Sequence, residues 1–401
     1  MRAHSTNPTT TASDTEGALR RIIKPGTTVA LGDGVGALRT NAEGAAICRM
    51  LGNVARDVGG VRLILGWVPQ APLDLNPADF ADVVVLMPGW GARSVLGDDR
   101  ARFLPVSLSA MPALLAEVLR PNLLITRLVE RAGLLYFGTE VSWQRGLMDA
   151  GVPVLALVDD AGPMASAETP VVPAMVTVVG RTGEGPAIVP QREPDAVHDE
   201  LADQVLRFVP EGARLQYGPG QLGAALMRRC AVPIRLDTGL LTDAVVELDR
   251  RGKLLGVPSA TYLIGSEVLY EWAEGRPILR GIDYSHDLTR LSRGEPFIAV
   301  NTAIEIDRYG QVNVEGVSDR VVGGIGGHPD FCCAGRSSPG GLSIIAVESR
   351  FKGRSPFVDR LSRPASTPAH DVDIVVTERG YADLRDCDWD RRGTLLAGLF
   401  D

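Results

Sequence analysis

The chain has 401 residues, of which 45% are hydrophobic and 22% are charged, and its formal net charge is −8 at pH 7. This length predicts two domains, and the acidic balance without a basic block disfavours nucleic-acid binding. No apolar run is long enough to span a bilayer. The odd number of cysteines without C-x-x-C spacing fits a reducing compartment, so we expect a soluble cytoplasmic protein without a bound metal. Residues 1–14 lack the apolar core of a signal peptide and predict a disordered tail.

The first half of the chain alternates strand-like and helix-like patterns. The segment 23–40 (IKPGTTVALGDGVGALRT) predicts a Pro-Gly turn, a short strand, a turn at Gly32, Gly34 and Gly36, and a helix that continues to Leu51. Short apolar runs bounded by glycine or proline indicate strands buried on both faces of a sheet. Such strands are predicted at 61–65, 83–87, 122–125 and 152–158, with a helix at 143–150. This alternation is typical of a largely parallel α/β structure.

The second half begins as the first does. Residues 183–197 are rich in proline, glycine and charge and indicate a domain boundary. Beyond them, 211–226 (EGARLQYGPGQLGAAL) repeats the strand, G-x-G and helix order of 25–40, and a second strand follows in both copies. We therefore predict an N-terminal α/β domain at 15–190 and a similar C-terminal α/β domain at 200–401. Ligands of open α/β sheets bind at the carboxyl ends of the strands, which singles out Gly66 and 237–239.

A glycine-rich loop, 321–331 (VVGGIGGHPDF), lies in the second half. Gly323, Gly324, Gly326 and Gly327 let the backbone adopt positive φ and approach a ligand closely, so the loop is either a tight turn or a binding site. Around it we predict a strand leading into a helix at 259–269, a strand pair at 298–306 with a hairpin return at 311–314, strands at 342–347 and 372–377, and a helix at the end of the chain.

Four motifs follow one another in this region. They are VNTAIEIDRYGQVNVE (300–315), GGIGGHPDF (323–331), SSPGGLSIIAVES (337–349) and DVDIVVTERGYADLR (371–385). In this order they resemble the C-terminal domain of the acetyl-CoA hydrolase / 4-hydroxybutyrate CoA-transferase family. Upstream, the Q-x-G-x-G loop at 216–220 resembles a family loop, and 23–36 resembles the first strand and glycine turn. The resemblance covers essentially the whole chain and is weaker in the first half.

The resemblance implies two open α/β domains with the active site in the cleft between them, and acyl-CoA as substrate. In such enzymes a glutamate attacks the thioester, and CoA rests on it as a glutamyl thioester before it moves to a carboxylic acid. The resemblance also implies that Gly326 and Gly327 donate backbone hydrogen bonds to the thioester oxyanion. The residues that it places on the CoA side are Gln216, Gly218, Gly220, Asn301, Gly323, Gly324 and Lys352. Family members commonly form homodimers.

Two departures from the family pattern affect the chemistry. The family nucleophile lies in a segment H-T-E-x-x-x-D-G, and this chain has Asp237-Thr238-Gly239 followed by Asp243. Gly239 occupies the place of the glutamate, and glycine cannot form an acyl anhydride. The second departure lies in the first domain, where the family has S-P-P-D and this chain has LVERAG (128–133). We expect the side of the pocket that binds the carboxylic acid to differ from that of the family.

Two other carboxylates are candidates for the missing role. Asp237 lies two residues before Gly239, so it is a candidate for a displaced nucleophile or a general base acting through water; the alternative is a turn former that binds its own backbone. Glu140, in FGTEVSW, is a candidate for a carboxylate projecting into the cleft; its alternative is a carboxylate at a helix start. His328 in the glycine loop is a candidate general acid or phosphate ligand, with a position at the rim of the site as the favoured alternative.

Three functions fit these residues. The first is an enzyme that acts on an acyl-CoA thioester without covalent transfer through glutamate, with hydrolysis as the simplest reaction and CoA-dependent C–C bond hydrolysis as a related one. The second is a CoA-transferase that uses a displaced carboxylate, with Asp237 as the first choice. The third is an acyl-CoA-binding protein without catalysis. The sequence does not identify the acyl group.

Overall fold

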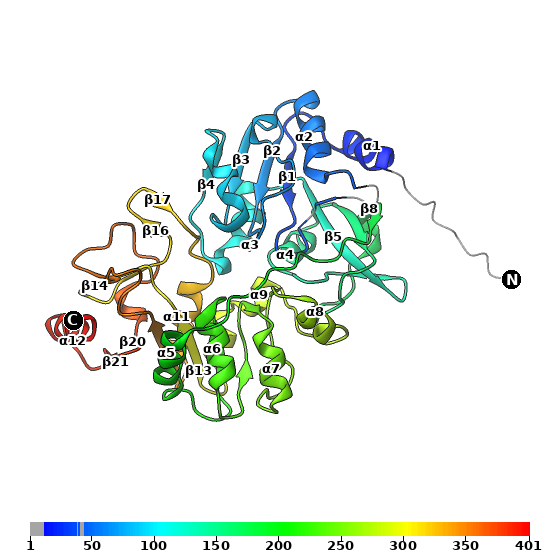
Figure 1. Cartoon of the computed structure of the whole chain (residues 1–401). Helices are drawn as coiled ribbons and strands as arrows, with labels where there is room; N and C mark the ends of the chain where they lie inside the picture. Colours follow the sequence, from blue (N-terminus) through cyan, green and yellow to red (C-terminus); the bar gives the residue numbers. More distant parts are fainter. Residues whose placement is uncertain (1–11, 38, 41–43) are drawn as a thin grey trace.

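The computed structural model describes residues 12–37, 39, 40 and 44–401 and folds into two lobes (Figure 1). Most of the predicted tail 1–14 lies outside the described residues, and its last three residues already belong to helix α1 (Ala12–Ile22). Each lobe is built around one sheet, and the chain passes from the first lobe to the second between 183 and 195. The structure is thus of the predicted α/β class.

The N-terminal lobe contains a mostly parallel sheet with the strand order β4-β3-β2-β1-β5-β7-β8, and β6 pairs with β5 in antiparallel orientation. Its strands are β1 (Thr28–Leu31), β2 (Arg62–Leu65), β3 (Asp82–Val85), β4 (Ala101–Phe103), β5 (Leu123–Arg131), β6 (Leu134–Tyr136), β7 (Val154–Asp159) and β8 (Val176–Thr182). Its helices include α1, α2 (Ile47–Val58), α3 (Met111–Ala113) and α4 (Gln144–Asp149). The helix predicted to continue to Leu51 is corrected at its start: Gly44 takes a φ of 75°, outside the range of a right-handed helix, and α2 begins at Ile47, while 38 and 41–43 lie outside the described residues.

The C-terminal lobe contains a second sheet with the strand order β10-β9-β13-β18-β20-β21. Its strands are β9 (Arg214–Tyr217), β10 (Arg235–Leu236), β13 (Phe297–Asn301), β18 (Leu342–Ala346), β20 (Ile374–Thr377) and β21 (Gly380–Asp383). Its helices are α5 (Ala196–Leu206), α6 (Gln221–Arg229), α7 (Ala244–Arg250), α8 (Glu267–Ala273), α9 (Ile282–Ser285), α10 (Leu288–Leu291), α11 (His328–Ser337) and α12 (Trp389–Phe400).

The sequence repeat corresponds to a repeat of topology. The parallel series β2-β1-β5-β7-β8 in the first sheet matches the parallel series β10-β9-β13-β18-β20 in the second. In the N-terminal lobe, β1 precedes the glycine turn and lies between β2 and β5. In the C-terminal lobe, β9 precedes the glycine turn and lies between β10 and β13. The predicted relation between 25–40 and 211–226 is therefore confirmed.

Short strands outside the two sheets connect and cap the lobes. They are β11 (Leu240–Leu241) with β12 (Tyr262–Leu263), β14 (Glu305–Asp307) with β15 (Val312–Asn313) and β19 (Phe357–Val358), and β16 (Gly316–Val317) with β17 (Arg320–Val321). The predicted hairpin of β14 and β15 is present. The strand pair predicted at 298–306 is corrected: β13 and β14 belong to different sheets, because each pairs with segments far away in the chain.

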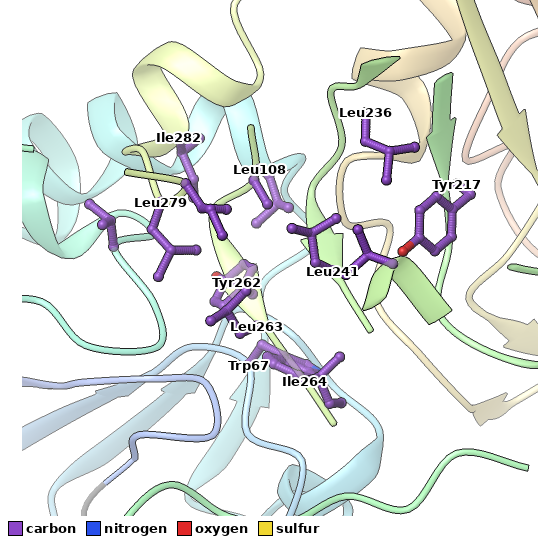
Figure 2. Packing of buried hydrophobic residues seen from close by; sticks show 14 of the residues in the cluster. Trp67, Leu108, Tyr217, Leu236, Leu241, Tyr262, Leu263, Ile264, Leu279 and Ile282 are labelled. Carbon is purple, nitrogen blue, oxygen red and sulfur yellow. The ribbon is translucent and has the colours of Figure 1, made fainter. Parts of the chain in front are cut away.

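The hydrophobic core is continuous between the lobes. Successive strand residues point to opposite faces, so Val29 and Leu31 of β1 pack with α1 and α2, whereas Ala30 belongs to a cluster that also contains Leu215 and Ile298 of the second sheet. Figure 2 shows part of this shared cluster, in which Trp67 and Leu108 of the N-terminal lobe lie among Tyr262, Leu263 and other side chains of the C-terminal lobe.

Backbone pairing also joins the lobes. The segment 139–142 pairs with β12, through the bridge of Glu140 with Tyr262 and the bond from the Val141 N–H to the Thr261 carbonyl oxygen at 3.1 Å. The strand β12 in turn pairs in parallel with β11, which directly follows Gly239. Chain from both lobes is therefore held around the region where the sequence predicts the active site.

Candidate active site

The glycine-rich loop 323–327 lies where the two lobes meet. Gly326 adopts a φ of 60°, and its carbonyl oxygen accepts a hydrogen bond from the N–H of Leu108 at 3.0 Å. A Cβ atom on Gly324 would lie 3.1 Å from Sδ of Met87. The loop is thus pressed against the N-terminal lobe, and glycine is needed for this close approach.

The N–H groups of Gly326 and Gly327 point to a binding function. Among the described residues, the Gly327 N–H donates no hydrogen bond to a protein acceptor, whereas the Gly326 N–H faces the backbone of the N-terminal lobe through the parallel bridge of Gly326 with Ser107. Gly327 is also the N-cap of α11, where the helix dipole is positive. Free N–H groups at a helix start form a site for a negatively charged oxygen.

Gly239 lies in the turn between β10 and β11 and is half-buried. A Cβ atom there would lie 3.4 Å from Cε2 of Phe331 and 3.5 Å from Nε2 of His286, which are ordinary contact distances. A Cβ atom on Gly327 would lie 2.5 Å from the same nitrogen, closer than packing allows. Gly239, Gly327, Phe331 and His286 therefore form one cluster, although up to 92 positions separate them in the chain.

His286 is buried in this cluster, with 2% of its surface exposed. Its ring packs on Phe331, with 4.6 Å between the ring centroids. Nδ1 lies 2.9 Å from Oγ of Ser285, and Nε2 has no hydrogen-bond partner among the described residues. Burial and the nearby Arg290 guanidinium lower the pKa of His286 to about 3, so the imidazole is neutral near pH 7.

A cavity of about 510 Å³ adjoins the cluster between the lobes. Its lining includes His286 and Asp283 from the C-terminal lobe, Asp330 at the start of α11, and Ser107 and Ser109 from the N-terminal lobe. The Ser109 hydroxyl donates to Oδ1 of Asp330 at 2.6 Å, and burial raises the pKa of this carboxyl. Polar groups of both lobes thus border the space next to His286.

Asp237 does not present a free carboxylate. Arg290 donates two hydrogen bonds to it, from Nη1 to Oδ2 at 2.7 Å and from Nη2 to Oδ1 at 2.8 Å. Nη1 of Arg214 lies 3.4 Å from Oδ2. The side chain of Asp237 is buried, so this is an ion pair with little access to solvent. Arg290 also donates to the carbonyl oxygens of Tyr284 and Ser285, which directly precede His286.

Glu140 lies at the first glycine turn of the N-terminal lobe. The Gly36 N–H donates to Oε2 at 3.0 Å, and the Thr139 hydroxyl donates to the same oxygen at 2.9 Å. Burial raises the pKa of Glu140 to about 7. The residue lies in the extended segment that pairs with β12, before α4 begins at Gln144, so it is not the first-turn carboxylate of a helix. Its contacts are with the first glycine turn and not with 323–327.

Asp33, the residue between Gly32 and Gly34, is a buried polar centre that the sequence interpretation missed. It accepts hydrogen bonds from the Tyr262 hydroxyl at 2.8 Å and from Nε1 of Trp143 at 3.0 Å. Burial raises its pKa to about 6. The bond from Tyr262 crosses between the lobes, so Asp33 helps to fix their relative position.

Four of the residues predicted on the CoA side, Gln216, Gly218, Gly220 and Asn301, lie close together in the C-terminal lobe. Gln216 and Asn301, on the neighbouring strands β9 and β13, exchange amide hydrogen bonds of 3.3 Å and 3.2 Å. Gly218 and Gly220 follow β9 and precede α6, and Gly220 has a φ of 117°. The structure thus brings these four residues together at the carboxyl ends of two adjacent strands.

Lys352 and His328 lie in contrasting surroundings. Lys352 is exposed in the loop after β18, with a φ of 50° and its Nζ 5.2 Å from the ring centre of Phe351. His328, expected at the rim, is buried: Nδ1 lies 2.7 Å from the Thr367 hydroxyl and Nε2 lies 2.9 Å from the Thr302 carbonyl oxygen. The rim position is therefore corrected, because both ring nitrogens are satisfied inside the protein.

The segment LVERAG (128–133), where the family pattern has S-P-P-D, forms the end of β5 and a tight turn into β6. Ala132 and Gly133 have φ values of 53° and 78°, as a two-residue hairpin turn requires. Nε of Arg131 in this hairpin lies 3.0 Å from Oε1 of Glu274 in the other lobe. The departure in sequence thus corresponds to a hairpin that contacts the C-terminal lobe.

The sequence interpretation also missed His286. It lies in YSHD (284–287), a polar stretch without glycine or periodicity, and nothing local distinguishes it from an exposed histidine. The sequence offered one weak indication. The chain has only five histidines in 401 residues, and histidine is the side chain that most readily accepts a proton near neutral pH, so each of the five is a candidate base. Its importance comes from its contacts with residues distant in the chain.

Two further properties concern the described part of the chain. No helix within it is long and apolar enough to cross a membrane. No group of three or more His, Cys, Asp or Glu side chains suited to a metal ion occurs among the residues from 12 to 401 that the structure describes.

Comparison with known proteins identifies the relationship. A family model described as acetyl-CoA hydrolase/transferase C-terminal domain matches residues 265–398. The chain is 26% identical over 240 residues to butyryl-CoA:acetate CoA-transferase of Anaerostipes caccae, covering 53% of this chain and 54% of that protein. It is 28% identical over 206 residues to 4-hydroxybutyrate coenzyme A transferase of Clostridium kluyveri, covering 47% and 48%. Residues 265–398 thus match the acetyl-CoA hydrolase/transferase C-terminal domain, and the two curated relatives that match about half of the chain are named as CoA-transferases.

The matched part spans about half the length of these curated relatives of the acetyl-CoA hydrolase/transferase family. Among solved structures, RipA from Yersinia pestis has a TM-score of 0.84 at 21% identity and covers 96% of this chain and 93% of its own. The fold is thus shared over nearly the whole chain. The predicted fold class is confirmed, and the predicted resemblance is confirmed for the domain at 265–398. Gly239, which lies before this domain in the chain, lies beside the glycine loop and His286 in the structure.

Proposed function

We propose that the protein hydrolyses an acyl-CoA thioester and that a water molecule, not a carboxylate of the protein, attacks the carbonyl carbon. The observation that carries this proposal is the environment of Gly239. A half-buried position next to Gly327 and His286 has room for a Cβ atom but has no side chain. The sequence resemblance places the nucleophilic glutamate there, and this chain has no carboxylate at that position to attack the thioester.

The glycine loop supplies the electrostatic part of the proposed mechanism. Attack on a thioester moves negative charge onto the carbonyl oxygen, and preorganised N–H donors lower the energy of this transition state by about 3–4 kcal/mol per donor. The N–H groups of Gly326 and Gly327 both lie at the positive end of α11, and that of Gly327 is free of protein acceptors among the described residues. These properties support their assignment as oxyanion donors.

The sequence resemblance assigns further residues to the CoA side of the site. Gln216 and Asn301 provide amide donors and acceptors at the ends of β9 and β13, and Gly218 leads to the start of α6. Gly323 and Gly324 precede the proposed oxyanion donors in the same loop, and Gly220 with its positive φ permits a close backbone path. The exposed cation of Lys352 suits a CoA phosphate.

The ion pair of Asp237 favours hydrolysis over transfer. A carboxylate nucleophile must be free to bond to the acyl carbon, whereas both oxygens of Asp237 accept hydrogen bonds from Arg290. Breaking a buried pair of this kind leaves an uncompensated charge and costs about 3–5 kcal/mol. The curated relatives are named as transferases, with acetate as the acid in one name, so transfer to a small carboxylic acid is the competing outcome that the test must resolve.

The test is an assay of the purified protein with acyl-CoA thioesters of increasing chain length, with and without acetate or succinate. We expect free thiol to appear at a rate that does not depend on the acid. New thioester that forms only when the acid is present would show transfer and contradict the proposal. Binding of acyl-CoA without release of thiol from any member of the series would show a binding protein.

A further inference from the structure

A buried nitrogen without a partner lies at the centre of the candidate site. Nε2 of His286 is one of few buried side-chain nitrogen or oxygen atoms in the described residues that lack a hydrogen bond. Leaving such a group unpaired costs about 1–3 kcal/mol. Natural structures usually retain an unpaired buried group where a ligand, a water molecule or a reaction uses it.

The protonation of His286 follows from its neighbour. The Ser285 hydroxyl donates its one proton to the carbonyl oxygen of Gly281 at 3.0 Å. Its oxygen therefore accepts a hydrogen bond from Nδ1 of His286, at 2.9 Å, and Nδ1 carries the ring proton. Nε2 is left with an unshared electron pair, which is the form in which histidine accepts a proton.

This electron pair lies beside the position where the thioester carbonyl would be bound. Nε2 is near both Gly327, an assigned oxyanion donor, and Gly239, where the nucleophilic carboxylate is missing. Glycine at both positions keeps a Cβ atom out of the space around Nε2. The ring also borders the 510 Å³ cavity between the lobes, while Nε2 itself is shielded from solvent beside the two glycines.

The ring is held in place by the residues on either side of it. Phe331 packs on one face, and Arg290 donates to the carbonyl oxygens of Tyr284 and Ser285. Arg290 is in turn fixed by the two hydrogen bonds to Asp237. Asp237, which directly follows β10, thus fixes Arg290, and Arg290 fixes the backbone just before His286. Asp237 therefore acts as a positioning residue for the imidazole.

We propose that His286 is the general base of the hydrolysis and replaces the chemistry of the absent carboxylate. This inference rests on the proposed function. Nε2 takes a proton from a water molecule as its oxygen bonds to the acyl carbon, and the carbonyl electron pair moves onto the oxygen bound by Gly326 and Gly327. When the C–S bond breaks, the CoA sulfur leaves with the bonding pair and takes the proton from Nε2. The products are the free acid and CoA thiol, and His286 is neutral again.

The electrostatics of the site are consistent with this sequence of steps. Burial and the Arg290 charge, which Asp237 partly neutralises, lower the pKa of His286 and keep Nε2 unprotonated before the reaction. The same two effects raise the energy of the imidazolium that forms when Nε2 takes the proton. The oxyanion that forms beside Gly327 during the attack carries the opposite charge. It stabilises the imidazolium at the moment when the proton is transferred.

The first test is kinetic. We expect His286→Ala to lower kcat by about 10²- to 10⁴-fold with little change in KM, because a general base acts on the transition state. His370→Ala, at an exposed histidine, is the matched control and should leave both constants unchanged. A kcat for His286→Ala within threefold of the wild type would overturn the proposal.

The second test does not depend on turnover or on a folded variant. Long-range proton–nitrogen NMR spectra of the histidine-labelled wild type should show His286 with its proton on Nδ1 and His328 with its proton on Nε2. Adding S-acetonyl-CoA, in which a methylene separates sulfur and carbonyl, should shift the Nε2 resonance of His286. A proton on Nε2, or no response to the analogue, contradicts the inference. A wild type that releases no thiol refutes the proposed function instead.

Discussion

Two glycines border the same imidazole and respond in opposite ways to an added methyl group. A Cβ atom on Gly327 would lie 2.5 Å from Nε2 and 2.7 Å from Cδ2 of His286, and 2.8 Å from Cε2 of Phe331. Real Cβ atoms do not approach so closely, so Gly327→Ala must displace both rings. Overpacking of this kind costs about 1–3 kcal/mol. Alanine is also a poor N-cap residue, which adds to the cost at the start of α11.

Gly239→Ala is the matched variant. Its Cβ atom would lie 3.4 Å or more from the same two side chains, and the backbone is outside the region of positive φ. Replacing glycine under these conditions stabilises a protein by about 0.4–1 kcal/mol through the unfolded chain. The two variants should therefore differ by about 1.5–4 kcal/mol in the free energy of unfolding.

Urea denaturation of both variants, each also made with His286→Ala, measures this difference. Removing the imidazole should relieve part of the cost of Gly327→Ala, whereas the N-cap contribution is the same in both backgrounds and cancels from the double-mutant cycle. Equal midpoints for Gly327→Ala and Gly239→Ala would refute the packing described here. A cost of Gly327→Ala that is unchanged without the imidazole would show that His286 is not the side chain that it displaces.

Other substitutions test the neighbouring contacts. Asp237→Asn should lower the free energy of unfolding by about 3–5 kcal/mol, because the buried Arg290 guanidinium loses its counter-ion; residual hydrolysis in this variant would exclude Asp237 as the nucleophile. Glu140 has a raised pKa of about 7 in the folded protein, so the stability that it contributes is full below its unfolded pKa of about 4.5 and is lost as the pH rises to about 7. Glu140→Gln should therefore gain up to about 3 kcal/mol relative to the wild type between pH 4.5 and pH 8, and a pH-independent difference would contradict the raised pKa. Tyr262→Phe should cost about 1–3 kcal/mol, measured by denaturation, because Asp33 loses a donor across the lobes; no change would mean that this bond contributes nothing.

The central strands of both sheets could be predicted because their residues are buried on both faces, whereas the partly exposed strands β4, β6, β8 and β21 were not predicted. Runs such as 61–65 and 152–158 are apolar without alternation and lie between glycine and proline, and the structure places β2 and β7 there. The repeat of strand and G-x-G at 25–40 and 211–226 also predicted the matching topology. Local patterns sufficed because burial and backbone conformation at these positions are local properties.

The contacts between the lobes could not be predicted. The strands β11 and β12 are two residues long, and 139–142 has no strand-like pattern, yet these segments pair with one another. The partners of Asp237 illustrate the same limit, because Arg290 lies 53 positions away in a helix of four residues. Nothing in the sequence near Asp237 indicates that its carboxylate is occupied.

The candidate site could likewise be predicted from the sequence only in part. The glycine loop and Gly239 could be found because they are motifs, or a departure from a motif, within a short stretch of sequence. The role proposed for His286 depends on three segments, around Gly239, Ser285 and Gly327, that meet only in the folded protein. A base defined by its surroundings has no signature in one segment.

The central claim, that water attacks the thioester directly, is tested by a single turnover in ¹⁸O-labelled water with protein in excess over acyl-CoA. Direct attack places one labelled oxygen in the released acid and none in the protein. Attack by a carboxylate of the protein, followed by hydrolysis of its thioester with CoA, releases unlabelled acid and leaves the label in that side chain. Mass spectrometry of the acid and of the peptides containing Asp237 and Glu140 measures both. We predict label in the acid alone, and label in a protein carboxylate would contradict the account.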